Sequence, residues 1–165
     1  MNFLPWYNLK LINFLDQILT SNLDIFEYGG GNSTLYYAKK VRSVSTVESK
    51  KEWLDFVINN KNNLQNIEIK MPSEIKYFDQ MINKFLLKTF DIIVIDSRDR
   101  SKCLIQATKY IKKNGLIILD NSERVNLINA KREMIKIGFN EKLFCGFRND
   151  GVFSISSIFS KDRIF

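Results

Sequence analysis

The sequence of 165 residues contains no histidine. A chain without histidine cannot build a Ser-His-Asp or Cys-His nucleophilic site, an imidazole acid or base, or a histidine-ligated zinc or haem site. Any catalysis by this chain therefore uses carboxylates, lysine, tyrosine, a hard metal ion or a bound cofactor.

Cysteine and long apolar runs are also scarce. Cys103 and Cys145 are the only cysteines, and their spacing fits neither a disulfide framework nor a metal knuckle, which favours a reducing compartment. The first ten residues lack the basic and apolar regions of a signal peptide, and no apolar run approaches the roughly 18 residues of a spanning helix. We therefore expect a cytoplasmic protein without a membrane span.

The remaining composition is typical of a globular protein. Apolar residues make up 45% of the sequence and charged residues 26%, and the length suits one folded unit, so we expect a single domain over residues 1–165. The 25 Lys and Arg exceed the 18 Asp and Glu, which gives a net charge of +7. Because the basic residues form no stripe, we interpret them as solvated surface rather than as a nucleic-acid site.

Helical and strand patterns alternate along the chain. Apolar residues at helical spacing predict helices, and β-branched or continuous apolar runs predict strands. The predicted helices cover 8–20, 33–40, one that opens at a capping box over 49–52, 73–88, one from Ser101 to about 114, and 125–137. We expect Asn8 and Ser101 to cap the first and fifth of these helices, and Trp53 to lie on the buried face of the third. The predicted strands cover 23–28, 41–47, 66–70, 90–96, 115–120, 141–147 and 152–160.

This order of elements predicts the fold class. The runs over 90–96 and 115–120 are continuously apolar, as in parallel strands that are covered on both faces. The last two strands flank Asn149-Asp150-Gly151, a hairpin-type turn. We therefore predict an α/β fold with a Rossmann-like, doubly wound sheet in three layers, mostly parallel with an antiparallel C-terminal hairpin.

Ligands of such sheets bind at the carboxyl ends of the strands. Glycines after the first strand let a bulky cofactor approach the backbone, and the following helix directs free N–H groups at it. A carboxylate at the end of the second strand can accept hydrogen bonds from a ribose diol. These features predict a site for an adenosine-type cofactor, with the candidate residues Glu27, Gly29, Gly30, Gly31, Ser33, Glu48, Ser49 and Asp96.

The glycine loop also indicates the class of cofactor. The dinucleotide fingerprint G-x-G-x-x-G needs glycine at position 34, where this chain has Thr34. The pattern Glu27-x-Gly29-x-Gly31-x-Ser33 instead resembles the first motif of class I S-adenosylmethionine-dependent methyltransferases. In that family the acidic residue organises the glycine loop around the amino-acid end of the cofactor, so the resemblance implies S-adenosylmethionine.

The resemblance covers most of the chain. Residues 90–96 are similar to the fourth strand of these enzymes with its terminal acid. Residues 96–100 resemble the D-G-R-D-R segment of a small bacterial methyltransferase family, with Ser97 in place of glycine, and residues 120–124 resemble its D-N-S-E/D-R segment. The antiparallel hairpin also fits, and the resemblance implies that an N-terminal helical segment, residues 1–22, folds over the cofactor cleft.

Methyl transfer from a sulfonium is a direct displacement that needs an acceptor held in line and no histidine. For an oxygen or nitrogen acceptor a base helps. The carboxylates at strand ends are Asp96, Asp99, Asp120 and Glu123, and we select Asp96 and Asp99 as catalytic candidates. Asp96 can instead hold the amino group of the cofactor.

A metal site is a further hypothesis. Catechol-type O-methyltransferases bind magnesium with an Asp after the fourth strand and an Asp-Asn pair after the fifth, and Asp96, Asp120 and Asn121 occupy the similar positions here. Those enzymes carry a lysine soon after the first Asp, where this chain has Arg98 and Asp99. In a first alternative, Asp120-Asn121 caps the following helix, and Arg98, Asp99, Arg100 and Arg124 form a structural ion-pair network. In a second, Arg98, Arg100 and Arg124 contact an anionic acceptor.

We predict S-adenosylmethionine-dependent O-methylation of a small molecule, a saccharide or another hydroxylated metabolite. The absence of an N/D-P-P-Y motif after the fourth strand disfavours a nucleic-acid amino-methyltransferase. The alternative is a non-catalytic nucleotide-binding or RNA-interacting module on the same fold. Because the cofactor fold uses nearly the whole chain, recognition of the acceptor falls to the N-terminal segment, the strand-end loops or the second subunit of a homodimer.

Overall fold

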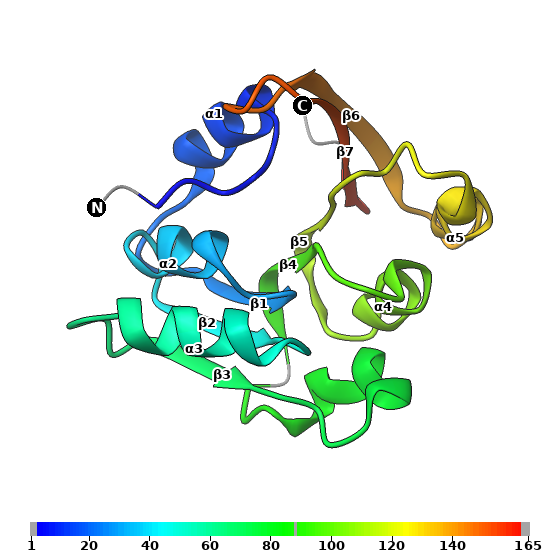
Figure 1. Ribbon diagram of the computed structural model, residues 1–165. Coiled ribbons are helices and arrows are strands. Elements are labelled where there is room, and N and C mark those ends of the chain that lie inside the picture. Colours follow the sequence, from blue (N-terminus) through cyan, green and yellow to red (C-terminus); the bar gives the residue numbers. More distant parts are fainter. Residues whose placement is uncertain (1–2, 88, 163–165) are drawn as a thin grey trace.

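The structure is a computed structural model that describes residues 3–87 and 89–162 (Figure 1). Seven strands form one sheet in the order β3-β2-β1-β4-β5-β7-β6. The strands are β1 Asp24–Tyr28, β2 Ser43–Val47, β3 Ile67–Lys70, β4 Phe90–Ile95, β5 Ile111–Leu119, β6 Asn140–Phe147 and β7 Phe153–Ser160. The first five strands pair in parallel, β7 is antiparallel to both neighbours, and the predicted sheet is confirmed.

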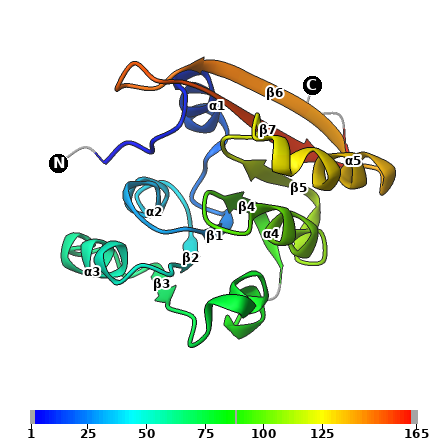
Figure 2. The same ribbon diagram turned by 45° about the vertical axis from the view of Figure 1, so that its right-hand side comes forward.

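Helices cover both faces of this sheet (Figures 1 and 2). The α-helices are α1 Leu9–Ile18, α2 Asn32–Ala38, α3 Lys51–Asn60, α4 Arg100–Ala107 and α5 Ile128–Lys136, and two 3-10 helices cover Ile75–Lys84 and Val125–Leu127. One apolar cluster joins α1 and α2 to the sheet, and a second joins α4, α5 and the first 3-10 helix to it. The domain therefore has the predicted three layers. None of the described helices is long and apolar enough to cross a membrane.

Three predicted elements differ from the structure. Residues 75–84 form a 3-10 helix with a kink at Tyr77 instead of an α-helix over 73–88. The apolar pattern does not distinguish the two, because Phe78 and Met81 are three positions apart and share a face in either helix type. Residue 88 lies outside the described residues. The helix predicted from Ser101 to about 114 ends at Ala107. Strand β5 begins at Ile111, which pairs with Phe90 ahead of a register shift, and not at Gly115.

Two predicted helix caps are also wrong. Helix α3 begins after Lys50, and no side chain caps it, because the carboxylate of Glu48 accepts the N–H groups of Ser49 and Lys50 instead. Helix α4 begins after Asp99, and the Ser101 hydroxyl donates to the carbonyl of Asn126 at 3.1 Å. At the starts of α3 and α4, polar side chains therefore serve the neighbouring loops.

Asn8 connects the N-terminal helix to the C-terminal hairpin. Its Oδ1 accepts the N–H of Leu11 at 3.0 Å, which confirms the predicted cap of α1. Its Nδ2 donates to the carbonyl of Phe144 at 3.0 Å and to Oγ of Ser156 at 3.2 Å, and Ser156 in turn donates to Asp120 at 2.8 Å. One buried amide therefore fixes α1, the hairpin and the end of β5 relative to one another.

We expect Asn8→Ala to lower the free energy of unfolding by about 2–4 kcal/mol, because it removes a helix cap and leaves the Phe144 carbonyl without this donor. Equilibrium denaturation in urea measures the change. The control is Asn63→Ala, at an exposed position, which we expect to stay within about 0.5 kcal/mol of the original protein. Equal effects of the two substitutions would contradict the structural role of Asn8.

Candidate active site

A cleft of about 480 Å³ opens beyond the carboxyl ends of β1, β2 and β4. Loops that follow these strands form most of its wall, and the N-terminal segment and α3 add one tryptophan each. The lining residues are Trp6, Gly29, Gly30, Gly31, Asn32, Ser33, Glu48, Ser49, Lys50, Trp53, Ile75, Asp96, Ser97, Arg98 and Arg100. Of the eight predicted cofactor residues, the structure brings all but Glu27 to this wall.

Glu27 lies beneath the glycine loop, fully buried. Its carboxylate accepts hydrogen bonds from the hydroxyls of Ser33, of Thr34 at 2.5 Å and of Thr46 at 3.1 Å. Burial raises the pKa of Glu27 to about 7, and these three hydrogen bonds oppose the rise. Glu27 thus holds the start of α2 against β2 instead of facing the cleft.

The glycine loop passes directly over the end of β4. Gly29 has a φ of +96° and donates its N–H to the carbonyl of Val47 at 2.8 Å. A Cβ atom on Gly29 would lie 2.3 Å from the backbone oxygen of Asp96, so only glycine fits here. The close approach places the loop and Asp96 on the same wall of the cleft.

Thr34 has a structural task that explains the departure from the dinucleotide fingerprint. Its Oγ1 accepts the N–H of Gly31 at 3.0 Å and donates to Glu27 at 2.5 Å. A glycine at this position could make neither contact. The threonine therefore links the loop to the buried carboxylate below it.

Glu48 joins the loops that follow β1 and β2. Oε1 accepts the N–H groups of Ser49 at 2.6 Å and of Lys50 at 2.7 Å, and Oε2 accepts the N–H of Gly30 at 2.9 Å. A carboxylate offers about four acceptor positions, so these three backbone contacts leave capacity for a ligand hydroxyl. The predicted cofactor residue lies in the cleft and is already oriented.

Two tryptophans form what we call the aromatic wall of the cleft. The Trp6 and Trp53 rings pack edge to face with centroids 5.5 Å apart, and the guanidinium of Arg148 lies 5.9 Å from the Trp6 ring. Trp6 is nevertheless 57% exposed. The sequence predicts that Trp53 lies on the buried face of its helix, but the structure places it in the wall of the cleft. Helical spacing alone cannot distinguish a residue that faces the core from one at the rim of a cleft.

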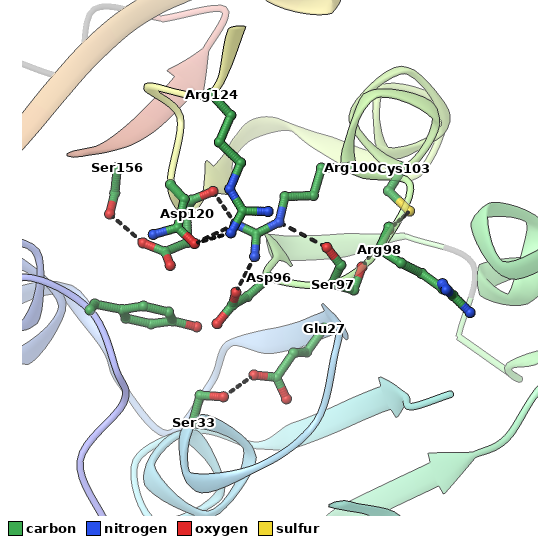
Figure 3. Close-up of polar contacts among 12 residues, drawn as sticks. Glu27, Ser33, Asp96, Ser97, Arg98, Arg100, Cys103, Asp120, Arg124 and Ser156 are labelled. Atoms are coloured by element: carbon green, nitrogen blue, oxygen red, sulfur yellow. Dashed lines mark hydrogen bonds and ion pairs between the residues drawn. The ribbon is translucent and has the colours of Figure 1, made fainter. Parts of the chain in front are cut away.

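Lys50 and Arg98 add positive charge to the cleft. Both are exposed, and within residues 3–87 and 89–162 neither makes an ion pair. Arg98 points away from the polar cluster around Asp96 (Figure 3). The sequence analysis did not select Lys50 as a residue of the site. Its position two residues after Glu48, in the loop that follows β2, was the available signal for a place in the cleft.

Arg100 lies at the centre of that polar cluster (Figure 3). It is buried, and its guanidinium donates to Oδ1 of Asp96 at 2.8 Å and to the carbonyl of Ser97 at 2.8 Å. It also donates to the carbonyl of Asp120 and to Oδ1 of Asn121 at 3.2 Å. The guanidinium thus connects the loop after β4 to the turn after β5.

The predicted magnesium ligands do not fit a metal ion. Asp120 is almost fully buried, and burial together with the charge of Asp96 raises its pKa to about 7, against the opposing hydrogen bond from Ser156. Asp96 and Asn121 both accept hydrogen bonds from Arg100, whose positive charge lies among the oxygens that would bind Mg²⁺. The described part of the chain contains no group of three acidic or cysteine side chains able to hold a metal.

The other carboxylate candidates lie elsewhere. Asp99 is exposed, with a φ of +51°, and does not belong to the described lining of the cleft. Glu123 accepts the N–H of Ile155 at 3.3 Å and so serves the hairpin. Among the four carboxylates selected from the sequence, only Asp96 reaches the described wall of the cleft.

Comparison with known proteins shows the fold. No family model matches the sequence, and no curated protein matches it. The structure is similar to a methyltransferase from Pyrococcus furiosus, with 23% identity, a TM-score of 0.69, and coverage of 92% of this chain and 81% of the other. It is also similar to an O-methyltransferase from Bacillus cereus in complex with S-adenosylhomocysteine (SAH), with 20% identity, a TM-score of 0.71, and coverage of 92% and 80%.

An rRNA methylase from Streptococcus thermophilus is a third neighbour, with 11% identity, a TM-score of 0.69, and coverage of 90% of this chain and 92% of the other. The names of these neighbours include both O-methylation and RNA methylation. The fold is therefore the Rossmann-like fold of methyltransferases, and it is compatible with acceptors of different chemistry.

We expect Gly29→Ala to lower the free energy of unfolding by roughly 2–5 kcal/mol, because the new Cβ combines an unfavourable φ with a collision at Asp96. The control is Gly138→Ala, where φ is +93° and no atom lies within 4 Å of the added Cβ. That control isolates the backbone strain, and we expect it to cost only about 1–2 kcal/mol. Urea denaturation compares the variants, and equal losses would refute the close approach.

The raised pKa values predict how stability depends on pH. Glu27 and Asp120 have a pKa of about 7 in the folded protein, against ordinary values of 4.5 and 3.8. The folded state therefore retains protons that the unfolded state releases. The resulting stability is present below about pH 4 and is lost as the pH rises through 7, by roughly 3 kcal/mol for Glu27.

Urea denaturation between pH 4 and 8 tests this expectation, and Glu27→Gln should flatten the decline. Asp24 provides a control of opposite sign, because its hydrogen bond with Arg42 lowers its pKa to about 2. The stability that the ionised Asp24 contributes is lost only as the pH falls below about 4. Asp24→Asn should therefore leave the change of unfolding free energy between pH 5 and 8 the same as in the original protein. Stability that rises from pH 4 to 7 would contradict the burial of Glu27.

Proposed function

We propose that this chain is an S-adenosylmethionine-dependent methyltransferase that acts on a small-molecule acceptor. The observation that supports the proposal most strongly is the glycine loop, which is anchored from below by Glu27 and joined at Gly30 to Glu48. This arrangement brings a glycine backbone without side chains and one oriented carboxylate to the same cleft. The fold shared with methyltransferases, one of them in complex with SAH, supports the same conclusion.

The residues of the cleft suit the parts of this cofactor. Glu48 is placed to accept hydrogen bonds from the ribose hydroxyls, and the backbone of Gly29 and Gly31 lies where the amino-acid end would bind. S-adenosylmethionine supplies an activated methyl group on a sulfonium when it is bound. The protein contributes orientation of the acceptor and exclusion of water, and neither task needs histidine.

Asp96 is the residue that we propose for proton transfer or for binding the cofactor's amino group. Its Oδ1 is held by Arg100 at 2.8 Å, and Oδ2 accepts no hydrogen bond from the described residues. A carboxylate with one fixed and one available oxygen can accept a proton from an acceptor hydroxyl. Because Asp99 is exposed outside the described cleft wall, it does not enter this proposal.

The aromatic wall supports a hydroxylated, ring-shaped acceptor. Trp6 is 57% exposed even though Trp53 packs edge to face with it and Arg148 lies over its ring, so part of the ring can pack on an apolar surface of a ligand. A saccharide or another hydroxylated metabolite presents both such a surface and a hydroxyl group. We therefore propose O-methylation, carried out in the cytoplasm, where the free thiols of Cys103 and Cys145 would stay reduced.

Lys50 and Arg98 favour a second candidate function. Two exposed cations in the cleft without ion pairs among the described residues could also meet the phosphates of a nucleotide or an RNA. The chain would then be a non-catalytic nucleotide-binding or RNA-interacting module. The two functions differ in the ligand that the cleft selects.

Calorimetric titration with SAH, NAD and a short RNA distinguishes the two functions. We expect heat of binding with SAH alone. Glu48→Gln should weaken SAH binding by about 10- to 100-fold, because it replaces the charged acceptor of the ribose hydroxyls. The control Glu52→Gln, at an exposed position outside the described cleft wall, should leave the affinity within twofold.

The titration can also refute the proposal. If NAD or RNA binds and SAH does not, the methyltransferase function is wrong. If SAH binds equally well to the original protein and to a folded Glu48→Gln variant, the cofactor lies elsewhere. Far-UV circular dichroism and a urea titration of each variant establish that it is folded.

A further inference from the structure

The cluster of oxygens at the ends of β4 and β5 contains its own cation. The Arg100 guanidinium offers five N–H donors in a rigid plane, and it makes four hydrogen bonds, to Asp96, Ser97, Asp120 and Asn121. The side chain is 9% exposed. Nearly all of its donor capacity is therefore used inside this cluster, and little remains for an acceptor molecule.

The four acceptors come from two separate loops. Strands β4 and β5 end their ladder at the hydrogen bond from the N–H of Asp120 to the carbonyl of Ile95, at 3.1 Å. Beyond this point, Arg100 joins the loop after β4 to the turn after β5 (Figure 3). The guanidinium thus acts as a clamp at the edge of the sheet that faces the cleft.

The cluster also needs a positive charge. Asp120 is buried beside the partly exposed Asp96, and one guanidinium donates both to Oδ1 of Asp96 at 2.8 Å and to the carbonyl of Asp120. Arginine keeps its charge at every pH at which the protein is folded. A fixed guanidinium therefore compensates the two carboxylates without any bound ion.

We propose that Arg100 is a built-in substitute for a divalent metal ion and is the positioning residue for Asp96 in the cleft. This inference rests on the proposed function, because Asp96 is its functional target. It has two consequences. Binding of SAH needs no divalent metal, and removal of the Arg100 side chain converts the oxygen cluster into a metal site.

Guanidinium and metal exclude each other at this place. A bound Mg²⁺ or Mn²⁺ would need the oxygens of Asp96 and Asn121 at about 2 Å, and the guanidinium nitrogens lie 2.8 and 3.2 Å from these same oxygens. A metal could approach only after Arg100 left. Arg124 is exposed and also donates to Asn121, at 3.1 Å, so the variants must include it.

Manganese binding tests the substitution, with electron paramagnetic resonance as the readout. We expect no Mn²⁺ binding to the original protein at 1 mM metal, a concentration that is about tenfold above the dissociation constant expected for the variants. Arg100→Ala, alone or with Arg124→Ala, should bind Mn²⁺, and Asp96→Asn added to either should abolish the binding. Arg132→Ala, an exposed arginine of α5, is the control and should behave like the original protein.

Binding of SAH tests the positioning role. Arg100→Ala should weaken SAH at least about tenfold, and millimolar guanidinium chloride should restore most of the affinity while equal sodium chloride should not. Arg100→Lys should lie between the two, because an ammonium keeps the charge and loses the planar contacts. Guanidinium rescue separates a local defect from a general loss of structure.

Three results would overturn the inference. They are Asp96-dependent Mn²⁺ binding by the original protein, no Mn²⁺ binding by folded Arg100→Ala/Arg124→Ala, and SAH affinity of Arg100→Ala within twofold of the original. If Arg100→Ala fails to fold, Arg100→Gln, which keeps a polar side chain without the charge, carries both measurements. Failure of the original protein to bind SAH would refute the proposed function alone, since the Mn²⁺ results do not depend on it.

Discussion

The buried carboxylate of Glu27 is the interaction on which the cleft depends. It accepts hydrogen bonds from hydroxyl groups in the first turn of α2 and in β2. One side chain of β1 therefore fixes three elements that meet at the cleft, namely β1, β2 and α2. Without these hydroxyls a carboxylate at this depth would be strongly unfavourable. Its raised pKa shows that the hydrogen bonds compensate only part of the cost of burial. The glycine loop can therefore line the cleft and still hold one shape.

Carboxylates near the cleft differ in role because they differ in exposure and in partners. Glu27 is fully buried and organises the loop from below. Glu48 lies at the surface of the cleft with three backbone N–H groups on its oxygens. Asp96 is fixed through one oxygen by Arg100. The order from Glu27 to Asp96 is thus one of increasing availability to a ligand, which is a property of packing and cannot be recognised from residue type alone.

The sequence predicted the sheet and most residues of the cleft wall. Apolar periodicity locates the strands along the chain, and the cleft lies where those strands end. The loop at Gly29 and the carboxylate of Glu48 lie where strand order places them. Side-chain direction was not predictable in this way. Asp99 directly follows a site segment and yet is exposed outside the described wall, and Asp120 points inward to Ser156. The structure does not support the magnesium hypothesis for the same reason, since the sequence offered an ion-pair network as an alternative but could not show that the Arg100 guanidinium lies among these oxygens.

Both terminal regions of the chain contribute to one rim of the cleft. Trp6 precedes α1, and Arg148, which lies against its ring, follows β6 in the hairpin. Asn8 connects these two regions through Phe144 and Ser156, so movement of the hairpin would displace the aromatic wall. The same Ser156 contacts Asp120 at the edge of the Arg100 cluster. The aromatic wall and Asp96 are therefore connected through one polar network, which runs from Asn8 by way of Ser156 and Asp120 to Arg100.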